Sequence, residues 1–474
     1  MTPSDFGYTN ISLEEFQKIE EYAKISTEKK SEIQSIYPMS PIQKGFLLNA
    51  LENNAQRTLT ILTVNGEIDI VLFQKAFDLL VQRHDILRTI FYYQDKENAW
   101  QVVLRERKLK IFFEDISALS IGKKEQYLEE FKKKEWGKSF DCREGHMRIS
   151  IIKTSSRYYK MFWSVHRTIF DGWCVGLVFR DFIRLYISLK ENVPIELEPV
   201  APYRQYIQWM EIQDREEWLN YWQQYLEGYQ NQAILPGARE PKKPGEFKSG
   251  IYKLTLDNTL TEGLKRVAEA QKVTINTIFQ TIWGVLLLHY NKTNDIVFGS
   301  TVNGRPPQVK GIENMVGVFV NTIPVRICST GSITFSQLLT EVQRKSVLSK
   351  PYEYTPSTEI LTLSPLKRKL LDSNMIFQNL PMASQIKEMN AQVQREKRGT
   401  KTGFGMKIVD FNVQTNFTLN VFIRESDLDK TEVGFYFNAA IYTLDIIKKA
   451  GKYLVGIVKQ VVQNPNIPLE KIKK

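Results

Sequence analysis

The sequence predicts a mixed α/β fold organised in two lobes, and three observations support this prediction. Segments with the alternating apolar pattern of strands interleave with amphipathic helical segments in both halves of the chain. The 474 residues are too many for one ordinary hydrophobic core. Residues 230–249 hold three prolines and two glycines, which mark a boundary. We therefore expect an interdomain linker over residues 1–35, an N-terminal lobe over 36–229 and a C-terminal lobe over 230–474.

The first half is expected to begin with a charged tail that holds one short helix, over residues 12–24. Ser40 and Pro41 suit the N-cap and the first turn of a helix over residues 42–51, because a serine hydroxyl caps well and proline loses no hydrogen bond there. The other helices expected in this half are residues 69–83, 123–134, 175–189, 203–209 and 216–229. The expected strands are residues 58–66, 100–104, 108–113, 147–153 and 158–165.

The second half repeats this style without any internal repeat of short period. The expected strands are residues 251–256, 295–301, 319–327, 372–378, 417–424 and 432–437. The expected helices are residues 260–271, 274–290, 334–348 and 443–462. Residues 383–405 are polar and are expected to form a mobile excursion.

Composition and charge exclude several classes of protein. No apolar run reaches the ~18–20 residues of a membrane helix, and the N-terminal residues form no basic and apolar leader. We therefore expect a cytoplasmic protein without a membrane partner. The net charge of +11 comes from small, scattered clusters that accompany no RNA- or DNA-binding motif, so no nucleic-acid partner is expected. The positive charge is either solvated surface or a basic face for an acidic partner.

The three cysteines, Cys142, Cys174 and Cys328, form no CxxC pair and no metal-ligand spacing. We expect three reduced thiols, no disulfide and no metal site.

The stretch of residues 164–173 is the candidate site. It follows the apolar, strand-like run of residues 158–163 and precedes the expected helix 175–189, and it contains His166, Arg167 and Asp171. A polar cluster at such a junction suits chemistry, because the strand fixes its position and the loop exposes it.

This stretch resembles the His-His-x-x-x-Asp-Gly signature of the condensation-domain superfamily of nonribosomal peptide synthetases, with Arg167 in place of the second histidine. Residues 37–45, 83–89 and 203–209, and the pair 298–306 and 316–326, resemble other motifs of that family. The five matches occur in the family's order. No Glu-Gly-His-Gly-Arg-Glu stretch of the epimerisation branch is present, and His166 stands where the heterocyclisation branch has aspartate.

The resemblance implies an α/β fold of two chloramphenicol acetyltransferase-like lobes, arranged as a V-shaped pseudo-dimer with a central tunnel. It implies donor and acceptor peptidyl carrier proteins as partners, whose phosphopantetheine arms deliver two thioesters. The acceptor amine attacks the donor thioester and a peptide bond forms. The domain itself is expected to bind no metal and no organic cofactor, to be monomeric, and to adjoin an adenylation domain in a parent synthetase. The N-terminal residues resemble an interdomain linker. A free-standing acyltransferase that uses coenzyme A is a further, less favoured alternative.

Arg167 conflicts with the mechanism that the family implies. There the second histidine hydrogen-bonds the attacking amine, as a base or an orienting group, which suits a side chain with a pKa near neutrality. Arginine stays protonated and has no lone pair to accept with, so Arg167 cannot be a general base. Three interpretations remain open: condensation in a weaker or altered form, a catalytically silent docking platform, or an engineered replacement. A silent type with His-Arg recruits oxygenases in glycopeptide synthetases, but it usually has a second acid where this chain has Gly172.

The remaining candidate residues receive their roles from the resemblance. The family implies that His166 is mainly structural. We predict that Asp171 is a buried carboxylate paired with an arginine, Arg83, because a buried charge needs a partner. Gly172 is expected to let the backbone turn closely into the next helix. Arg88 and Trp173 are expected to support the site, and Asn321 and Thr322 are expected to line the tunnel. The candidate catalytic set is His166, Arg167, Asp171 and Gly172.

Overall fold

The structure is a computed structural model, and its contacts group the chain into two compact units. It describes residues 11–26, 32–53, 57–95, 98–108, 110–140, 146–241, 246–329, 331–378, 405–413, 417–425 and 430–473. Unit 1 comprises Met1–Gln213, Arg305–Phe319 and Leu380–Thr415, and unit 2 comprises Asp214–Gly304, Val320–Asn379 and Asn416–Lys474. Two segments from the second half of the sequence therefore belong to unit 1. The lobe boundary between residues 229 and 230 stays a prediction, as does the linker over residues 1–35.

A small antiparallel sheet with one helix on it opens unit 1. Its strand order is β1 (Ile33–Pro38), β4 (Ala99–Leu104) and β3 (Thr89–Tyr93), and α1 (Leu13–Ser26) packs beside it. Phe16 and Ile19 of α1 are buried in this cluster. The expected helix in the N-terminal tail is therefore present, and the described part of that tail is packed against the unit.

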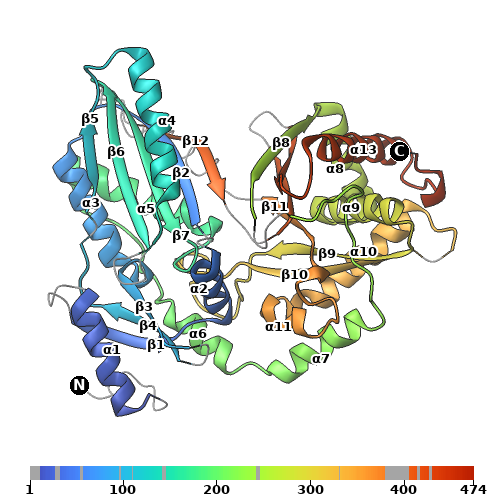
Figure 1. Ribbon diagram of the computed structural model, residues 1–474, viewed down its shortest axis with the longest axis horizontal. Coiled ribbons are helices and arrows are strands. Elements are labelled where there is room, and N and C mark those ends of the chain that lie inside the picture. Colours follow the sequence, from blue (N-terminus) through green and yellow to red (C-terminus); the bar gives the residue numbers. More distant parts are fainter. Residues whose placement is uncertain are drawn as a thin grey trace. The chain divides into compact units, whose positions relative to one another are not determined.

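A five-stranded sheet forms the body of unit 1 (Figure 1). Its order is β12 (Gly405–Val413), β2 (Arg57–Asn65), β7 (Tyr158–His166), β6 (Met147–Ser155) and β5 (Phe112–Asp115). β12 comes from far along the chain and pairs antiparallel with β2 over its length. The sequence did not predict β12. The excursion expected over residues 383–405 lies outside the described residues except for its last residue, which begins β12.

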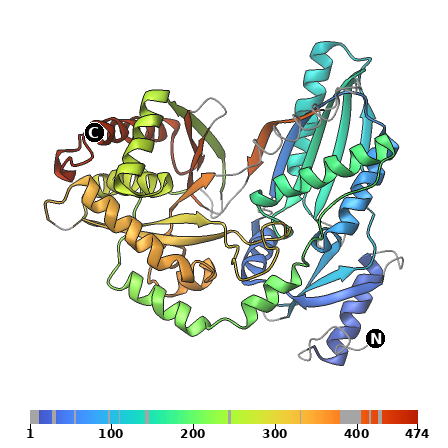
Figure 2. The same cartoon turned by 180° about the vertical axis from the view of Figure 1, so that it is seen from behind.

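Helices cover both faces of this sheet. Successive side chains of β7 point to opposite faces, so alternate residues of this strand face different helices. Met161 and Trp163 belong to the core shared with α3 (Ile70–Arg83) and α5 (Gly172–Glu191). Phe162 belongs to the core under α4 (Ile121–Gly137). Figure 2 shows α5, in green, crossing the sheet on the face opposite α4. The same alternation places Ser164 and His166 toward the α4 face.

Further helical elements from the first half of the chain also belong to unit 1. They are α2 (Pro41–Asn53), the short 3-10 turn η2 (Asp85–Arg88) and α6 (Arg204–Glu211). α2 begins with the predicted cap: the Ser40 hydroxyl accepts from the Gln43 backbone N–H, and Gln43 Oε1 accepts from the Ser40 N–H in return.

Unit 2 is built on a six-stranded mixed sheet. Its order is β10 (Asn321–Cys328), β9 (Asp295–Val302), β11 (Ser373–Gln378), β13 (Leu419–Glu425), β14 (Thr431–Asn438) and β8 (Ser249–Leu256). One core contains residues of α8 (Asn258–Gln271), α9 (Ile275–Asn291), α10 (Phe335–Ser349) and α13 (Leu444–Gln463). A smaller core contains residues of α7 (Arg215–Leu226) and α11 (Ser357–Thr362).

The mixed α/β prediction is confirmed, and the differences lie in short or edge elements. The sequence analysis did not predict β1, β3, β12 and α11. These elements are too short, or depend too much on a distant partner strand, to show a clear periodic pattern of apolar residues. The strand expected over residues 108–113 is described only as Phe112–Asp115. Among the described residues, none of the helices combines the length and the apolar content that crossing a membrane demands.

Candidate functional site

His166 is the last residue of β7 and is enclosed by its own loop. Its backbone N–H donates to the His146 carbonyl oxygen at 2.8 Å. The Thr168 backbone N–H donates to His166 Nδ1 at 3.3 Å, and Thr168 Oγ1 lies 2.8 Å from the same nitrogen. The neutral ring therefore carries its proton on Nε2. Burial, with the guanidiniums of Arg167 and Arg57, lowers the pKa of His166 to about 3. A neutral, enclosed imidazole fits the structural role that we predict for His166.

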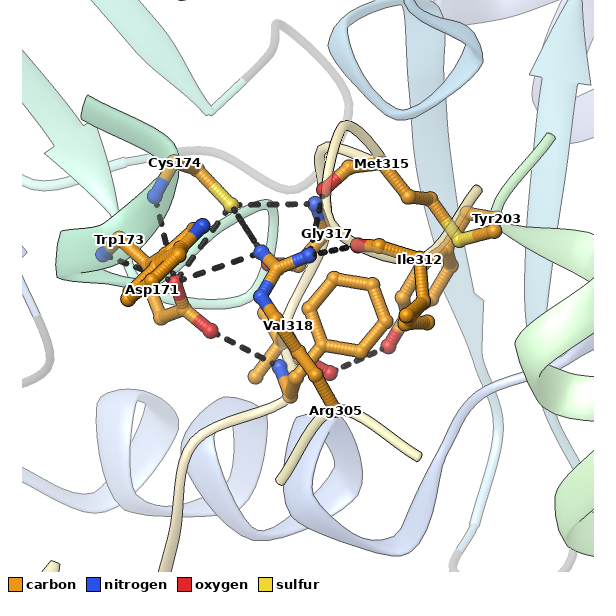
Figure 3. A network of polar contacts seen from close by, with 10 residues as sticks. Asp171, Trp173, Cys174, Tyr203, Arg305, Ile312, Met315, Gly317 and Val318 are labelled. Carbon is orange, nitrogen blue, oxygen red and sulfur yellow. Dashed lines mark hydrogen bonds and ion pairs between the residues drawn. The ribbon is translucent and has the colours of Figure 1, made fainter. Parts of the chain in front are cut away.

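Asp171 closes the loop as the N-cap of α5 (Figure 3). Its Oδ1 accepts from the backbone N–H groups of Trp173 at 3.1 Å and Cys174 at 3.4 Å. Its Oδ2 accepts from the Phe319 backbone N–H at 3.0 Å. Asp171 thus joins the start of α5 to the segment 305–319, which is 134 or more residues further along the chain.

The arginine nearest to Asp171 in this network is Arg305, whose Nη2 lies 4.0 Å from Asp171 Oδ1. Both side chains are buried. Burying a carboxylate is costly unless a cation and hydrogen bonds compensate for the lost water, and the site supplies both.

The prediction that Asp171 pairs with Arg83 is wrong. Arg83 Nε donates to Asp181 Oδ2 at 2.8 Å, and its guanidinium also bonds to the Glu198 carbonyl oxygen. Asp181 lies ten residues beyond Asp171 on α5, which is about 15 Å along a helix axis. The C-terminal end of α3 therefore meets the middle of α5 and not its N-terminus.

Arg305 also organises the segment to which it belongs. Its Nη1 donates to the carbonyl oxygens of Ile312 and Met315, the latter at 2.9 Å. The guanidinium lies over the Phe319 ring, with Cζ 4.0 Å from the ring centroid. One side chain therefore shapes residues 305–319 and carries the charge that faces Asp171.

Cys174 connects α5 to the same segment by its sulfur atom. Arg305 Nη2 donates to Sγ at 3.1 Å, and Sγ lies 3.2 Å from the Gly317 carbonyl oxygen and 3.4 Å from the Gly317 nitrogen. Burial and the neighbouring Asp171 raise the pKa of the Cys174 thiol to about 12. The thiol stays protonated at neutral pH, so Cys174 is a hydrogen-bonding group and not a nucleophile.

Gly317 lies flat against an aromatic ring of α6's N-terminus. A Cβ atom at this position would lie 2.1 Å from Tyr203 Cδ2, closer than real side chains approach. The Tyr203 hydroxyl donates to the Val318 carbonyl oxygen at 2.6 Å. The close approach of backbone and ring explains why glycine is required here.

Arg167 lies over an aromatic ring of α2. Its Cζ is 4.4 Å from the centroid of the Phe46 ring, and the side chain is partly buried. Burial lowers the pKa of Arg167 to about 10, and the charge of Asp171 opposes this shift. The guanidinium therefore remains protonated at neutral pH, and it cannot accept a proton from an amine.

Gln43, one turn before Phe46 on α2, holds the loop from the other side. Its Nε2 donates to the Thr168 carbonyl oxygen and to Gln101 Oε1, both at 2.9 Å. Gln101 in turn donates to the Pro38 carbonyl oxygen at 3.0 Å. The loop that carries Arg167 is therefore tied to α2 and to the small sheet.

Gly172 of the predicted catalytic set and the two predicted supporting residues Trp173 and Arg88 lie in three different surroundings. Gly172 is the exposed first residue of α5 and is not among the glycines with positive φ, so the turn into the helix does not depend on left-handed backbone. The Trp173 ring centroid lies 5.9 Å from Arg305 Cζ, at the edge of the network. Arg88 is not at the site: it bonds to Asp85, to the Leu104 carbonyl oxygen and to Gln34 in the small sheet.

Asn321 and Thr322 are the first residues of β10 in unit 2. Asn321 is buried and uses its whole amide on backbone groups: Nδ2 donates to the carbonyl oxygens of Glu353 at 2.9 Å and Thr355 at 2.6 Å, and Oδ1 accepts from Ser357 N at 3.2 Å. This geometry holds the connection before α11 in place. The role of both residues as tunnel lining stays a prediction.

The site contains three side chains that sequence reasoning did not assign: Gln43, Cys174 and Arg305. Gln43 and Arg305 both lie inside segments that resemble family motifs, so a polar residue within a motif was the available signal. Cys174 gave no signal beyond its position next to Trp173. Cys174 and Cys328 are free thiols, whereas Cys142 lies outside the described residues. Within the described part of the chain, no group of three or more His, Cys, Asp or Glu side chains could hold a metal ion.

Comparison with known proteins agrees with this geometry. The family described as "Condensation domain" matches residues 33–474. Gramicidin S synthase 2 of Brevibacillus brevis is 35% identical over 452 residues, which cover 94% of this chain and 10% of that protein. The chain thus spans about a tenth of the length of that curated relative.

Solved structures show the same fold at low sequence identity. The X-domain from teicoplanin biosynthesis is 19% identical, with a TM-score of 0.76 and coverage of 92% of this chain and 97% of that chain. A complex of the X-domain and OxyB from teicoplanin biosynthesis gives 20% identity, a TM-score of 0.75 and coverage of 92% and 95%. The fold is that of condensation domains, which is chloramphenicol acetyltransferase-like.

The family match covers nearly the whole chain, the relative exceeds 30% identity, and the predicted signature loop lies at the end of β7 with its aspartate capping α5. The chain belongs to the condensation-domain family of nonribosomal peptide synthetases.

Proposed function

We propose that this chain forms a peptide bond between two thioesters carried on phosphopantetheine arms. The acceptor amine nitrogen attacks the donor carbonyl carbon, the new C–N bond forms, and the C–S bond breaks. The amine loses one proton, and the departing sulfur becomes a free thiol. The observation that supports this most is the set of contacts around Asp171. Its carboxylate contacts both the start of α5 and the distant segment 305–319, and these contacts fix the conformation of the signature loop.

Condensation without a base at residue 167 is energetically reasonable. Losing general-base assistance typically costs 10²–10⁴-fold in rate. Holding two reactants in an attack geometry can lower a barrier by about 7–11 kcal/mol. The barrier reduction from positioning the two thioesters is therefore larger than the barrier increase from losing the base. We expect an enzyme that is slower than its relatives but still active.

A second candidate function is a catalytically silent platform that docks a tailoring enzyme or a carrier protein. Arg167 favours it, because a guanidinium protonated at neutral pH cannot act as a base. The X-domain that forms a complex with OxyB has the same fold. Gly172 counts against it, since the silent type usually has an acid there.

The proposed function carries further expectations about partners. We propose donor and acceptor carrier proteins and an adjacent adenylation domain as partners, no cofactor bound by the domain itself, a monomeric domain and a cytoplasmic location. The net charge of +11 would favour acidic carrier proteins. We also propose that Asn321 and Thr322 line the tunnel that receives the substrates.

A single-turnover assay with mass spectrometry tests the proposal. Carrier proteins are loaded with D- or L-aminoacyl donors, and a panel of L-aminoacyl carrier proteins serves as acceptors. The chain is assayed beside Arg167→His, with Arg344→His on the exposed end of α10 as a matched control.

We expect dipeptide from the chain itself, with a faster rate for Arg167→His. Dipeptide from both proteins would exclude the silent platform. Dipeptide from Arg167→His alone would show an intact site that one residue disables. Product from neither protein across the whole panel would contradict the proposed function and favour the docking role.

A further inference from the structure

A small pocket lies within unit 1, where the C-terminal end of α3 meets the connection that precedes α6. Its volume is about 40 Å³, and its lining consists of residues 83–86, residues 200–203 and Val316. All of these residues belong to unit 1 and come from outside the signature loop. Each water molecule needs roughly 10–15 Å³ of cavity volume of this kind, so the pocket has room for about three.

His84 contributes a buried imidazole to this lining, with only 2% of the residue exposed. Its Nε2 lies 3.1 Å from Asp181 Oδ2, which also accepts from Arg83 Nε at 2.8 Å. Burial opposes the ionisation of Asp181, but the hydrogen bonds from His84 and Arg83 outweigh burial and hold the pKa of this carboxyl below its usual range. Because an ionised carboxylate can only accept, His84 Nε2 carries a proton and donates it.

The other ring nitrogen of His84, Nδ1, is buried and has no hydrogen-bond partner within the described part of the chain. Buried polar atoms in native proteins are almost always hydrogen-bonded, because an unsatisfied one has lost its water without compensation. Nδ1 accepts a hydrogen bond when the imidazole is neutral and donates one when the ring is protonated. A partner that suits both forms of the ring must be able to donate and to accept.

We propose that this pocket is a binding site for ordered water, and that one of the bound water molecules hydrogen-bonds to His84 Nδ1. Water both donates and accepts, so it suits Nδ1 in either protonation state of the ring. A buried water molecule typically makes about three hydrogen bonds, and Arg83 and Asp85 supply further polar groups in the same lining. A small anion fits less well, because the carboxylate of Asp85 would repel it.

The bound water completes a junction of three parts of unit 1. Val316 in the lining belongs to the segment 305–319. Asp181, the partner of the imidazole, lies on α5 and also accepts from Arg180 Nε at 3.1 Å. Arg180 Nη1 donates to Asn314 Oδ1 of the same segment at 3.0 Å. Water in the pocket therefore fills the space where the end of α3, the middle of α5 and this segment meet. The inference concerns binding and does not depend on the proposed function.

A crystal structure of the chain, at a resolution that shows ordered water, tests this inference. It is compared with the structures of two variants. His84→Gln has an amide that can still donate to Asp181, but it has no atom in place of Nδ1. His84→Asn places a polar atom near the position of Nδ1, but it does not reach Asp181. Unfolding midpoints verify that both variants fold. A second crystal of the chain is soaked in sodium bromide, so that anomalous scattering reveals any anion in the pocket.

We expect density for a water oxygen about 2.7–3.2 Å from Nδ1 in the chain, the same water in His84→Asn, and its loss from His84→Gln. Bromide in place of this water would overturn the inference and assign an anion site. A pocket of the chain that holds neither water nor bromide would overturn it as well. A water that keeps its position in His84→Gln would show that Nδ1 does not bind it. If neither variant folds, the two crystals of the chain decide.

Discussion

Arg305 Nη2 lies 4.0 Å from Asp171 Oδ1, and the two buried side chains join the second half of the sequence to the signature loop. The pair lies within unit 1, although 134 residues separate its members. Arg305 reaches Asp171 and Cys174 from one side and the carbonyl oxygens of Ile312 and Met315 from the other. The segment 305–319 and the start of α5 are therefore one hydrogen-bonded structure (Figure 3).

Arg305→Met should destabilise unit 1. Removing one member of a buried ion pair leaves the other charge without compensation, which costs about 3–5 kcal/mol. Chemical denaturation should show the transition of unit 1 at a lower denaturant concentration. Arg344→Met, which removes an exposed arginine paired with Glu341, should change stability by less than about 1 kcal/mol. Equal effects of the two substitutions would contradict the role of Arg305.

Gly317→Ala should also destabilise unit 1, for a steric reason. The new Cβ would lie 2.1 Å from the Tyr203 ring, so the ring or the segment must move, at a cost of about 1–3 kcal/mol. Thermal unfolding measures the effect. Gly122→Ala on α4 is the control, because a Cβ there meets nothing within 4 Å. A fully stable Gly317→Ala protein would show that the segment is not held against Tyr203.

Gln43→Met should loosen the loop that carries Arg167. The substitution leaves the buried carbonyl oxygen of Thr168 and the side chain of Gln101 without their hydrogen-bond donor, at about 1–3 kcal/mol for each unsatisfied group. We expect lower stability and a condensation rate about tenfold or more below that of the chain itself, since misplaced groups lose rate steeply. Gln126→Met, at an exposed position of α4, should change neither quantity. If Gln43→Met lowered the stability but left the condensation rate unchanged, the Gln43 hydrogen bonds would stabilise the fold without positioning the site.

Stability should fall on acidification because of His166. Burial lowers its pKa to about 3, whereas a histidine in an unfolded chain has a pKa of about 6.5. Between these values the unfolded state binds a proton that the folded state does not, so the free energy of unfolding falls as the pH falls. At pH 5 the loss relative to pH 7.5 should be about 2 kcal/mol from this residue.

Urea denaturation of the chain and of His166→Gln at both pH values measures this loss. His146, whose pKa burial lowers well below its usual value, contributes a loss of the same sign, so the variant should keep part of the pH dependence. An identical pH dependence of the two proteins would show that His166 binds its proton equally in both states.

Local patterns predicted much of the fold. The period along residues 69–83 and 175–189 predicted α3 and α5, and Ser40 with Pro41 predicted the start of α2. These features depend on neighbours three or four residues away, which a single sequence contains. The site loop was likewise predicted from its contiguous motif, and the structure places His166 at the end of β7 and Asp171 at the cap of α5.

Long-range pairing was not predictable in the same way. Arg83 lies inside a recognisable motif and is a plausible partner for Asp171, yet it binds Asp181. Arg305 lies inside another motif-like segment, and nothing in either local pattern tells which of the two arginines faces Asp171. Likewise, β12 joins β2 although more than 300 residues separate them. No periodicity carries such information, because many arginines or strands satisfy the same local rules and only the folded backbone brings one of them within range.

By itself, the sequence determined the mixed α/β class, most helices and strands, the family motifs and the presence of a permanent cation at residue 167, since each depends on residue type or on near neighbours. The tertiary structure alone decided which arginine faces Asp171, that Arg167 lies over Phe46, and that Gln43 and Cys174 hold the loop and the segment 305–319 together. The physical reason is that burial and pairing of polar groups depend on distances through space, which chain folding sets across hundreds of residues.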